Sequence, residues 1–193
     1  ALEGVIVTCG ATVKWLRDQL GLISSSSEIE AMAKAVDDNG GVYLLPAFSG
    51  MGAPHWKMDA KGSIVGLTFG ATKNHVARAA LESVAFQIKD VITAMEADSK
   101  TPLSRLKLDG GMTANTFLMR MIADLLGVQT VTMGMEEVSA LGAAYMAGLQ
   151  TGVFDSLESL ATLQTEQTVH EPGNGERILE AYDGWRAMLA KHC

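Results

Sequence analysis

The sequence predicts an α/β domain, in which strands and helices pack in layers. Short apolar or alternating segments that suit β-strands take turns with longer segments of helical periodicity, and some strands near the middle follow one another directly. The 48% hydrophobic content can fill a sizeable core, which argues against a disordered chain. At 193 residues the chain fits one domain, or one domain with a small appendage.

The first half of the chain is expected to alternate between short strands and helices. The strands are expected at residues 2–7, 42–45 and 63–68, and the helices at residues 13–20, 29–36 and 74–97. Thr12 is expected to cap the first helix and Gly21 to end it. The third helix is the longest periodic segment, because apolar residues from Val76 to Met95 recur on one face. Glu82 lies beside that face, so it is either a boundary residue or a contact for another domain.

The second half continues the alternation with shorter elements. Strands are expected at residues 106–108 and 127–132, and helices at residues 118–125, 139–148, about 156–160 and 178–189. Ser139 is expected to cap the helix that follows it. The mostly polar residues 162–176 are expected to form a connector.

A double-glycine turn lies between the strand at 106–108 and its helix. Gly110 and Gly111 allow backbone angles and close approaches that a Cβ would block. A glycine turn that leads into a helix N-terminus presents free N–H groups, which suit a phosphate-bearing ligand. An ordinary strand-to-helix turn is the alternative, and the segment alone does not decide between them. The turn matches neither G-x-x-x-x-G-K-[ST] nor G-x-G-x-x-G, which argues against the common phosphate loops and against a dinucleotide-dependent oxidoreductase.

Other polar residues carry weaker signals. Lys14 could reach a phosphate, but most lysines are solvated. His55 and Trp56 lie in a loop rich in glycine and proline, where packing of an aromatic loop is a better interpretation than a catalytic pair. Asp109 is better explained as an acceptor within its turn than as a ligand.

Charge and composition argue against several classes of partner. The net charge of −7 and the pI near 5.0 argue against a nucleic-acid-binding surface, which would normally be basic. No apolar run approaches the roughly 18–20 residues that would span a bilayer, so no membrane partner is expected. Two cysteines, Cys9 and Cys193, suit a reducing compartment, and a cytoplasmic location is expected. The four histidines lack ligand spacing, so no metal site is expected.

The first residues suggest a longer protein. Ala1 is not a methionine, and the predicted first strand starts almost at once. A domain that starts inside a sheet is expected to be part of a longer chain.

Three stretches together resemble the FGGY family of carbohydrate kinases. Residues 62–67, followed after seven residues by 75–82, match the second sequence motif of that family. Residues 46–56 are most similar to the corresponding loop of its glycerol-phosphorylating members. Residues 108–111 with Asn115, and then residues 139–144, resemble its nucleotide-binding end. The similarity is close from Ala1 to about Leu160 and looser after that.

The resemblance implies an actin-like, ribonuclease-H-like fold, with a mixed sheet flanked by helices. It implies that residues 1–193 form the C-terminal nucleotide-binding domain, which closes with an N-terminal domain on ATP and the substrate. In the family, the residue that matches Gly10 lies by the nucleotide phosphates, and those matching Gly111 and Asn115 lie by the nucleotide and its adenine. Gly110, which precedes Gly111 in the same turn, is also expected to bind the nucleotide. Lys14 stands where a glutamine commonly contacts the nucleotide, and a lysine can meet a phosphate oxygen.

The resemblance also implies an activity, namely transfer of the ATP γ-phosphoryl group to a polyol or sugar. Glycerol is the favoured acceptor, with xylulose, ribulose or gluconate as alternatives. The catalytic aspartate and the Mg²⁺-associated acidic residues of the family belong to its N-terminal domain, so no catalytic residue is assigned here. A non-enzymatic actin-like module that binds nucleotide is the competing interpretation, and the sequence leaves homo-oligomerisation open.

Overall fold

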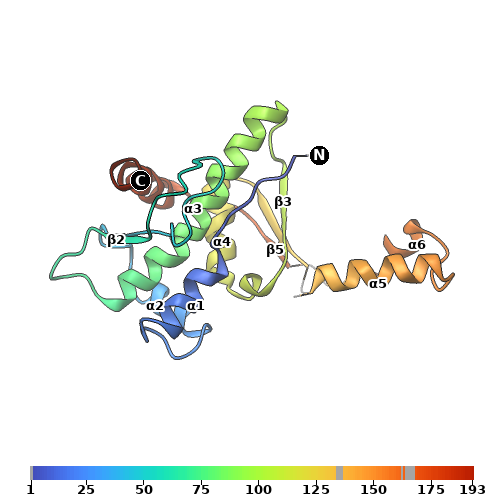
Figure 1. Ribbon diagram of the computed structural model, residues 1–193, viewed down its shortest axis with the longest axis horizontal. Helices are drawn as coiled ribbons and strands as arrows, with labels where there is room; N and C mark the ends of the chain where they lie inside the picture. The colour runs from blue at the N-terminus through green and yellow to red at the C-terminus, as the bar shows by residue number, and fades with distance from the viewer. Residues whose placement is uncertain (1, 134–136, 162, 164–167) are drawn as a thin grey trace.

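The computed structural model describes the whole chain except residues 1, 134–136, 162 and 164–167. The described part contains seven α-helices, five strands and one 3₁₀ helix (Figure 1). In chain order these are α1 (Gly10–Asp18), α2 (Glu28–Lys34), β1 (Tyr43–Leu45), β2 (Ser63–Val65), α3 (Lys73–Ser99), β3 (Arg105–Leu108), the 3₁₀ helix Gly111–Ala114, α4 (Thr116–Leu126), β4 (Gln129–Thr132), α5 (Val138–Gln150), α6 (Leu157–Ala161), β5 (Thr168–His170) and α7 (Glu176–His192).

The larger sheet is mixed, as expected. Its strand order is β3-β4-β5, with β3 parallel to β4 and β4 antiparallel to β5. The parallel pair needs a crossover connection, and α4 supplies it between β3 and β4. The smaller sheet is the antiparallel pair of β1 and β2. The predicted α/β class with a mixed sheet is therefore confirmed.

Helix α3 is the centre of the core. It is 27 residues long, it lies between the other elements in Figure 1, and it packs against α2, α4, β1 and α7. Phe86 of α3 is fully buried against the rings of Tyr182 and Trp185 from α7. The Trp185 indole N–H donates to the carbonyl oxygen of Leu44 in β1 at 2.9 Å. This contact joins the last helix to the smaller sheet.

Two predictions for the N-terminal segment are wrong. Residues 2–7 are not a strand, and the side chains of Leu2, Val5 and Val7 are exposed. A strand needs a hydrogen-bonded neighbour, and no described segment pairs with these residues. Thr12 does not cap α1, because the helix begins at Gly10 and Thr12 lies buried inside its first turn.

Two predictions for the C-terminal part are also wrong. Ser139 lies inside α5 rather than at its cap, since Glu137 takes the N-cap position. Residues 168–170, expected in a polar connector, form β5 at the edge of the larger sheet. In Figure 1, α5 and α6 project away from the body of the domain.

The loop between β1 and β2 is fixed through His55. Its Nε2 lies 2.7 Å from Oδ2 of the buried Asp90 in α3, and the Tyr182 hydroxyl donates to Oδ1 of the same carboxylate. Burial and the Asp90 carboxylate raise the pKa of Tyr182 well above its usual value. Trp56, by contrast, is 70% exposed. His55 and Trp56 therefore do not act as a pair, and His55 anchors the loop to α3 and α7.

Candidate functional site

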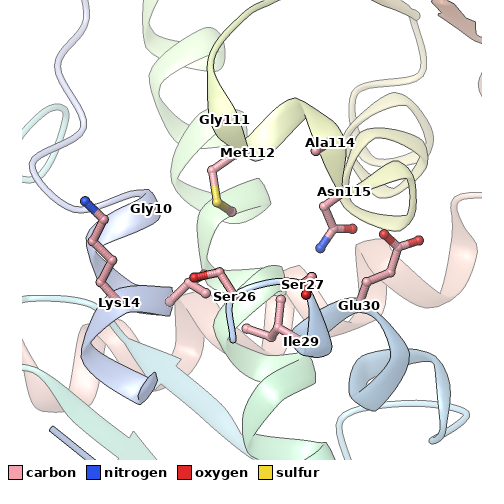
Figure 2. Close-up of a pocket in the computed structure, with 11 residues that line it drawn as sticks. Gly10, Lys14, Ser26, Ser27, Ile29, Glu30, Gly111, Met112, Ala114 and Asn115 are labelled. Atoms are coloured by element: carbon pink, nitrogen blue, oxygen red, sulfur yellow. The ribbon is translucent and has the colours of Figure 1, made fainter. Parts of the chain in front are cut away.

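A pocket of about 540 Å³ lies where three segments distant in the sequence meet (Figure 2). They are the start of α1, the start of α2 with the residues before it, and the turn that leads into α4. The lining residues are Gly10, Val13, Lys14, Ser26, Ser27, Ile29, Glu30, Gly111, Met112, Ala114 and Asn115. The structure thus brings together four of the five predicted site residues, and Gly110 is adjacent in sequence without lining the pocket.

The two glycines of the turn are glycine for different reasons. Gly110 has a φ of 94°, a backbone conformation that side chains disfavour, and its carbonyl accepts from the Thr113 amide at 3.0 Å. Gly111 has no such φ, and no protein atom lies within 4 Å of the Cβ that it lacks. Neither backbone strain nor packing therefore explains why residue 111 is a glycine. The missing side chain leaves open space at the pocket wall.

Asn115 has two roles that use different atoms. It is the N-cap of α4, and its Oδ1 accepts from the Leu118 amide at 2.9 Å. This bond also fixes the orientation of the Asn115 side chain, because the backbone N–H of Leu118 can donate to Oδ1 but not to the Nδ2 group, which is itself a donor. The Nδ2 group, which capping does not use, is directed toward the pocket in Figure 2. The cap thus presents a hydrogen-bond donor to the pocket.

The charged residues of the pocket lie at opposite ends. Lys14 projects back along α1, so that its ammonium lies on the side of Gly10, while Glu30 lies on the side of Asn115 (Figure 2). The N-terminus of α1 adds free N–H groups and a positive partial charge at the Lys14 end. An elongated ligand with an anionic end would therefore bind with that end toward Gly10 and Lys14.

Glu30 connects two walls of the pocket. Its Oε1 accepts from the Thr116 hydroxyl of α4 at 2.9 Å and from the Lys34 ammonium within α2. Burial alone would raise the pKa of the Glu30 carboxyl, but the hydrogen bonds from Lys34 and Thr116 outweigh it and hold the pKa below its usual value. Glu30 is therefore ionised at neutral pH, and it fixes α2 against the start of α4.

Sequence reasoning missed the α2 side of the pocket. Ser26, Ser27 and Glu30 were expected only as a polar loop and a short helix. Their contribution depends on contacts such as Glu30 with Thr116, which are 86 positions apart. No local pattern signals such a contact.

The comparisons with known proteins agree with this fold. Residues 1–151 match the C-terminal domain model of the FGGY family of carbohydrate kinases. The chain is 52% identical over 192 residues to a glycerol kinase of Trichlorobacter lovleyi, covering 99% of this chain and 39% of that protein. It is 56% identical over 192 residues to a glycerol kinase of Methylorubrum extorquens, covering 99% and 38%. The chain thus spans about two fifths of the length of these relatives.

Solved structures show the same architecture. A Plasmodium falciparum glycerol kinase crystallised with ADP superposes with a TM-score of 0.84 at 32% identity, over 97% of this chain and 37% of that one. A xylulose kinase of Lactobacillus acidophilus shares the fold with a TM-score of 0.78 at 24% identity, over 97% and 39%. The predicted actin-like fold is confirmed by these neighbours. Because the match to this family covers most of the chain, the chain belongs to the FGGY family of carbohydrate kinases.

Proposed function

We propose that this chain is the nucleotide-binding half of an ATP-dependent polyol kinase, with glycerol as the favoured acceptor. The pocket between α1, α2 and the Gly110–Gly111 turn carries the proposal, because four residues expected at a nucleotide line it together. The relatives named above are glycerol kinases, and the Plasmodium enzyme was crystallised with ADP. Xylulose, ribulose and gluconate remain alternative acceptors.

Each lining residue would have a distinct task. The N-terminus of α1 at Gly10 and the Lys14 ammonium would bind phosphate oxygens, because free N–H groups and a cation both favour an anion. Gly111 would leave room for the nucleotide to approach the backbone. Asn115 would donate from Nδ2 to the base. These contacts position ATP, which is the main contribution a protein makes to phosphoryl transfer.

We assign no Mg²⁺ ligand to the pocket residues. Within the described ranges, no three histidine, cysteine, aspartate or glutamate side chains are close enough to hold a metal ion. The one carboxylate of the pocket, Glu30, is already bound by Lys34 and Thr116. The Mg²⁺ that such a kinase uses would neutralise charge on the phosphates, and its protein ligands would come from another domain.

The rest of the catalytic machinery would lie on a partner domain. We infer that residues 1–193 act as a C-terminal domain, and that an N-terminal domain supplies the catalytic base and most of the acceptor site. Closure of the two domains would exclude water as a competing acceptor. No described helix is both long and apolar enough to cross a membrane. The proposal includes a cytoplasmic location, where ATP is available, and no nucleic-acid partner.

A chimera tests the function. The matching segment of the Trichlorobacter lovleyi glycerol kinase is replaced by residues 1–193, to which it is 52% identical. We expect the purified chimera to form ADP in the presence of glycerol, and more slowly with xylulose, ribulose or gluconate. The isolated chain should bind ATP weakly and transfer nothing. Polyol-dependent ADP formation by the isolated chain, or a folded chimera that neither binds ATP nor turns over, would contradict the proposal.

Asn115→Asp tests the base contact without removing the helix cap. Aspartate caps a helix as well as asparagine does, but it has no N–H donor. We expect ATP binding by the isolated chain to weaken by about 1–3 kcal/mol, with little change in the melting temperature. Asn174→Asp is the matched control, since Asn174 Oδ1 accepts from the Glu176 amide at the start of α7 and Asn174 does not line the pocket. Equal ATP affinity of the Asn115 variant and the control would reject the contact.

A further inference from the structure

The side of the pocket near Asn115 presents one hydrogen-bond donor and one acceptor. The donor is Nδ2 of Asn115, because Oδ1 is occupied by the Leu118 amide. The acceptor is the Glu30 carboxylate, which lies beside it in Figure 2. An ionised carboxylate can only accept hydrogen bonds, so this pair has a fixed polarity.

The Glu30 carboxylate keeps capacity for a ligand. It offers about four acceptor positions. Its side-chain donors are the Thr116 hydroxyl and the Lys34 ammonium, and both bind Oε1. Neither of these donors binds Oε2, and Glu30 lines the pocket. A donor on the ligand could therefore complete the hydrogen bonding of the carboxylate.

We propose that Glu30 determines which nucleobase this site accepts, by selecting a base with an exocyclic amine next to a ring nitrogen. Such a base donates its amine hydrogen to Glu30 and accepts from Asn115 Nδ2. A base with a carbonyl at the same position brings an oxygen against the carboxylate, and both groups are then acceptors without a donor between them. Adenine fits this pair and 6-oxopurines do not. The inference rests on the proposed function, and it adds a specificity residue to that site.

A comparison of two diphosphates tests the inference. Adenosine diphosphate and inosine diphosphate differ at this position, where one has an amine and the other a carbonyl. Ligand-observed NMR titrations of the 193-residue chain measure both dissociation constants even when binding is weak. We expect the adenosine ligand to bind about tenfold tighter or more, since its amine can donate to the Glu30 carboxylate whereas the carbonyl of the wrong base is repelled by it.

The Glu30→Gln variant should reduce this discrimination. Glutamine has nearly the same size, and its amide can present either an oxygen to an amine or an N–H to a carbonyl. The affinity ratio should therefore fall to about twofold or less, mainly through improved inosine diphosphate binding. Glu28→Gln is the matched control, because Glu28 is on the same helix, accepts from the Ser24 amide and does not line the pocket.

A purely structural role for Glu30 predicts a different pattern. Thr116→Val removes the hydroxyl that binds Glu30 and leaves the carboxylate in place. If Glu30 only holds α2 against α4, Glu30→Gln and Thr116→Val should weaken both nucleotides equally and leave the ratio unchanged. That result would overturn the inference, and so would a wild-type chain that binds both nucleotides equally. A wild-type chain that binds neither would overturn the proposed nucleotide-binding function itself.

Discussion

Replacing Glu82 with alanine is expected to lower the free energy of unfolding by about 3–5 kcal/mol. Glu82 is 1% exposed, and both of its carboxylate oxygens accept hydrogen bonds. Oε1 accepts from Arg78 Nε at 2.8 Å, and Oε2 accepts from Asn39 Nδ2 at 2.8 Å. Burial raises the pKa of the Glu82 carboxyl, and Arg78 and Asn39 oppose that effect. Alanine would leave the Arg78 guanidinium, whose side chain is 15% exposed, without its counter-charge.

Denaturant unfolding measures this effect. Asp98→Ala is the control, since Asp98 is an exposed acid on the same helix, and its loss should change stability by less than about 0.5 kcal/mol. The double variant Arg78→Met with Glu82→Leu should recover part of the loss, because it removes both charges together. A Glu82→Ala protein within about 1 kcal/mol of wild type would show that the ion pair does not stabilise the fold.

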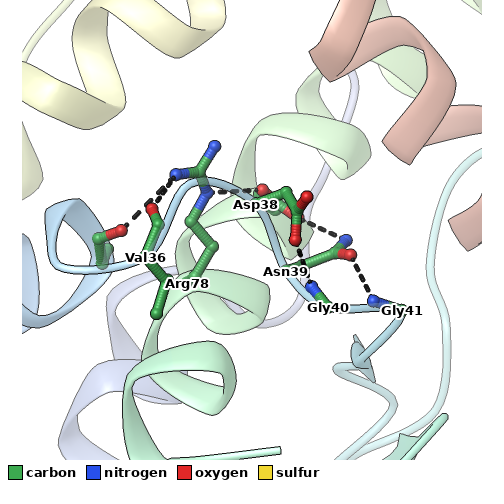
Figure 3. A network of polar contacts seen from close by, with 8 residues as sticks. Val36, Asp38, Asn39, Gly40, Gly41 and Arg78 are labelled. Atoms are coloured by element: carbon green, nitrogen blue, oxygen red, sulfur yellow. Dashed lines mark hydrogen bonds and ion pairs between the residues drawn. The ribbon is translucent and has the colours of Figure 1, made fainter. Parts of the chain in front are cut away.

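The Glu82 network also holds the end of α2. Arg78 Nη1 donates to the carbonyls of Val36 at 3.0 Å and Ala33 at 3.4 Å, which lie at the end of α2 (Figure 3). Glu82 was expected to be either a boundary residue or a contact for another domain, and the structure shows instead an internal partner. Because α2 carries Glu30 to the pocket, the Glu82→Ala variant should also bind nucleotide less well than its folded fraction predicts.

The Gly111→Val variant is expected to fold normally and to lose ATP binding by at least about tenfold. No protein atom lies within 4 Å of the added Cβ, and the backbone of Gly111 does not require positive φ. The fold should therefore accept valine with little cost. The new methyl groups would occupy space at the pocket wall, where the proposed nucleotide approaches the backbone.

Titration of the isolated chain and the Michaelis constant of the chimera for ATP both measure this loss. Gly70→Val is the control, because Gly70 lies in an exposed loop and its added Cβ would make only an ordinary contact, 3.7 Å from Thr68 Oγ1. Unchanged ATP affinity in a folded Gly111→Val protein would show that the nucleotide does not bind against this wall of the pocket. A large drop in melting temperature would show that the glycine is needed by the fold instead.

The sequence predicted those features that depend on neighbouring residues. The apolar stripe of α3 and the turn at Gly110 and Gly111 were both correct, because helix periodicity and glycine conformations are local properties. Residues 2–7 have the pattern of a strand, but a pattern cannot show whether a partner strand is available. The polar sequence around β5 does not indicate a strand. These residues adopt the extended conformation because they pair with the neighbouring strand β4.

The residues of the candidate site also differ in whether the sequence could predict them. Gly10, Gly111 and Asn115 were found because their types and spacing resemble a known family, although no residue pattern alone placed them in one pocket. Glu30 was not found, because its importance depends on α4 being folded against α2. Contacts between residues far apart in the chain are fixed by tertiary packing, and these place the Glu30 carboxylate at the pocket.

The N-cap at Asn115 restricts which residues evolution can place there. Aspartate and serine would preserve the start of α4 but would lose the amide donor, whereas glutamine would keep an amide on a side chain less suited to capping. Two unrelated requirements, one from folding and one from the proposed ligand, thus converge on a single residue type. A related protein that did not bind the proposed ligand would still need a capping residue at this position. The position should therefore drift first toward other capping residues, and only later toward residues that neither cap nor bind.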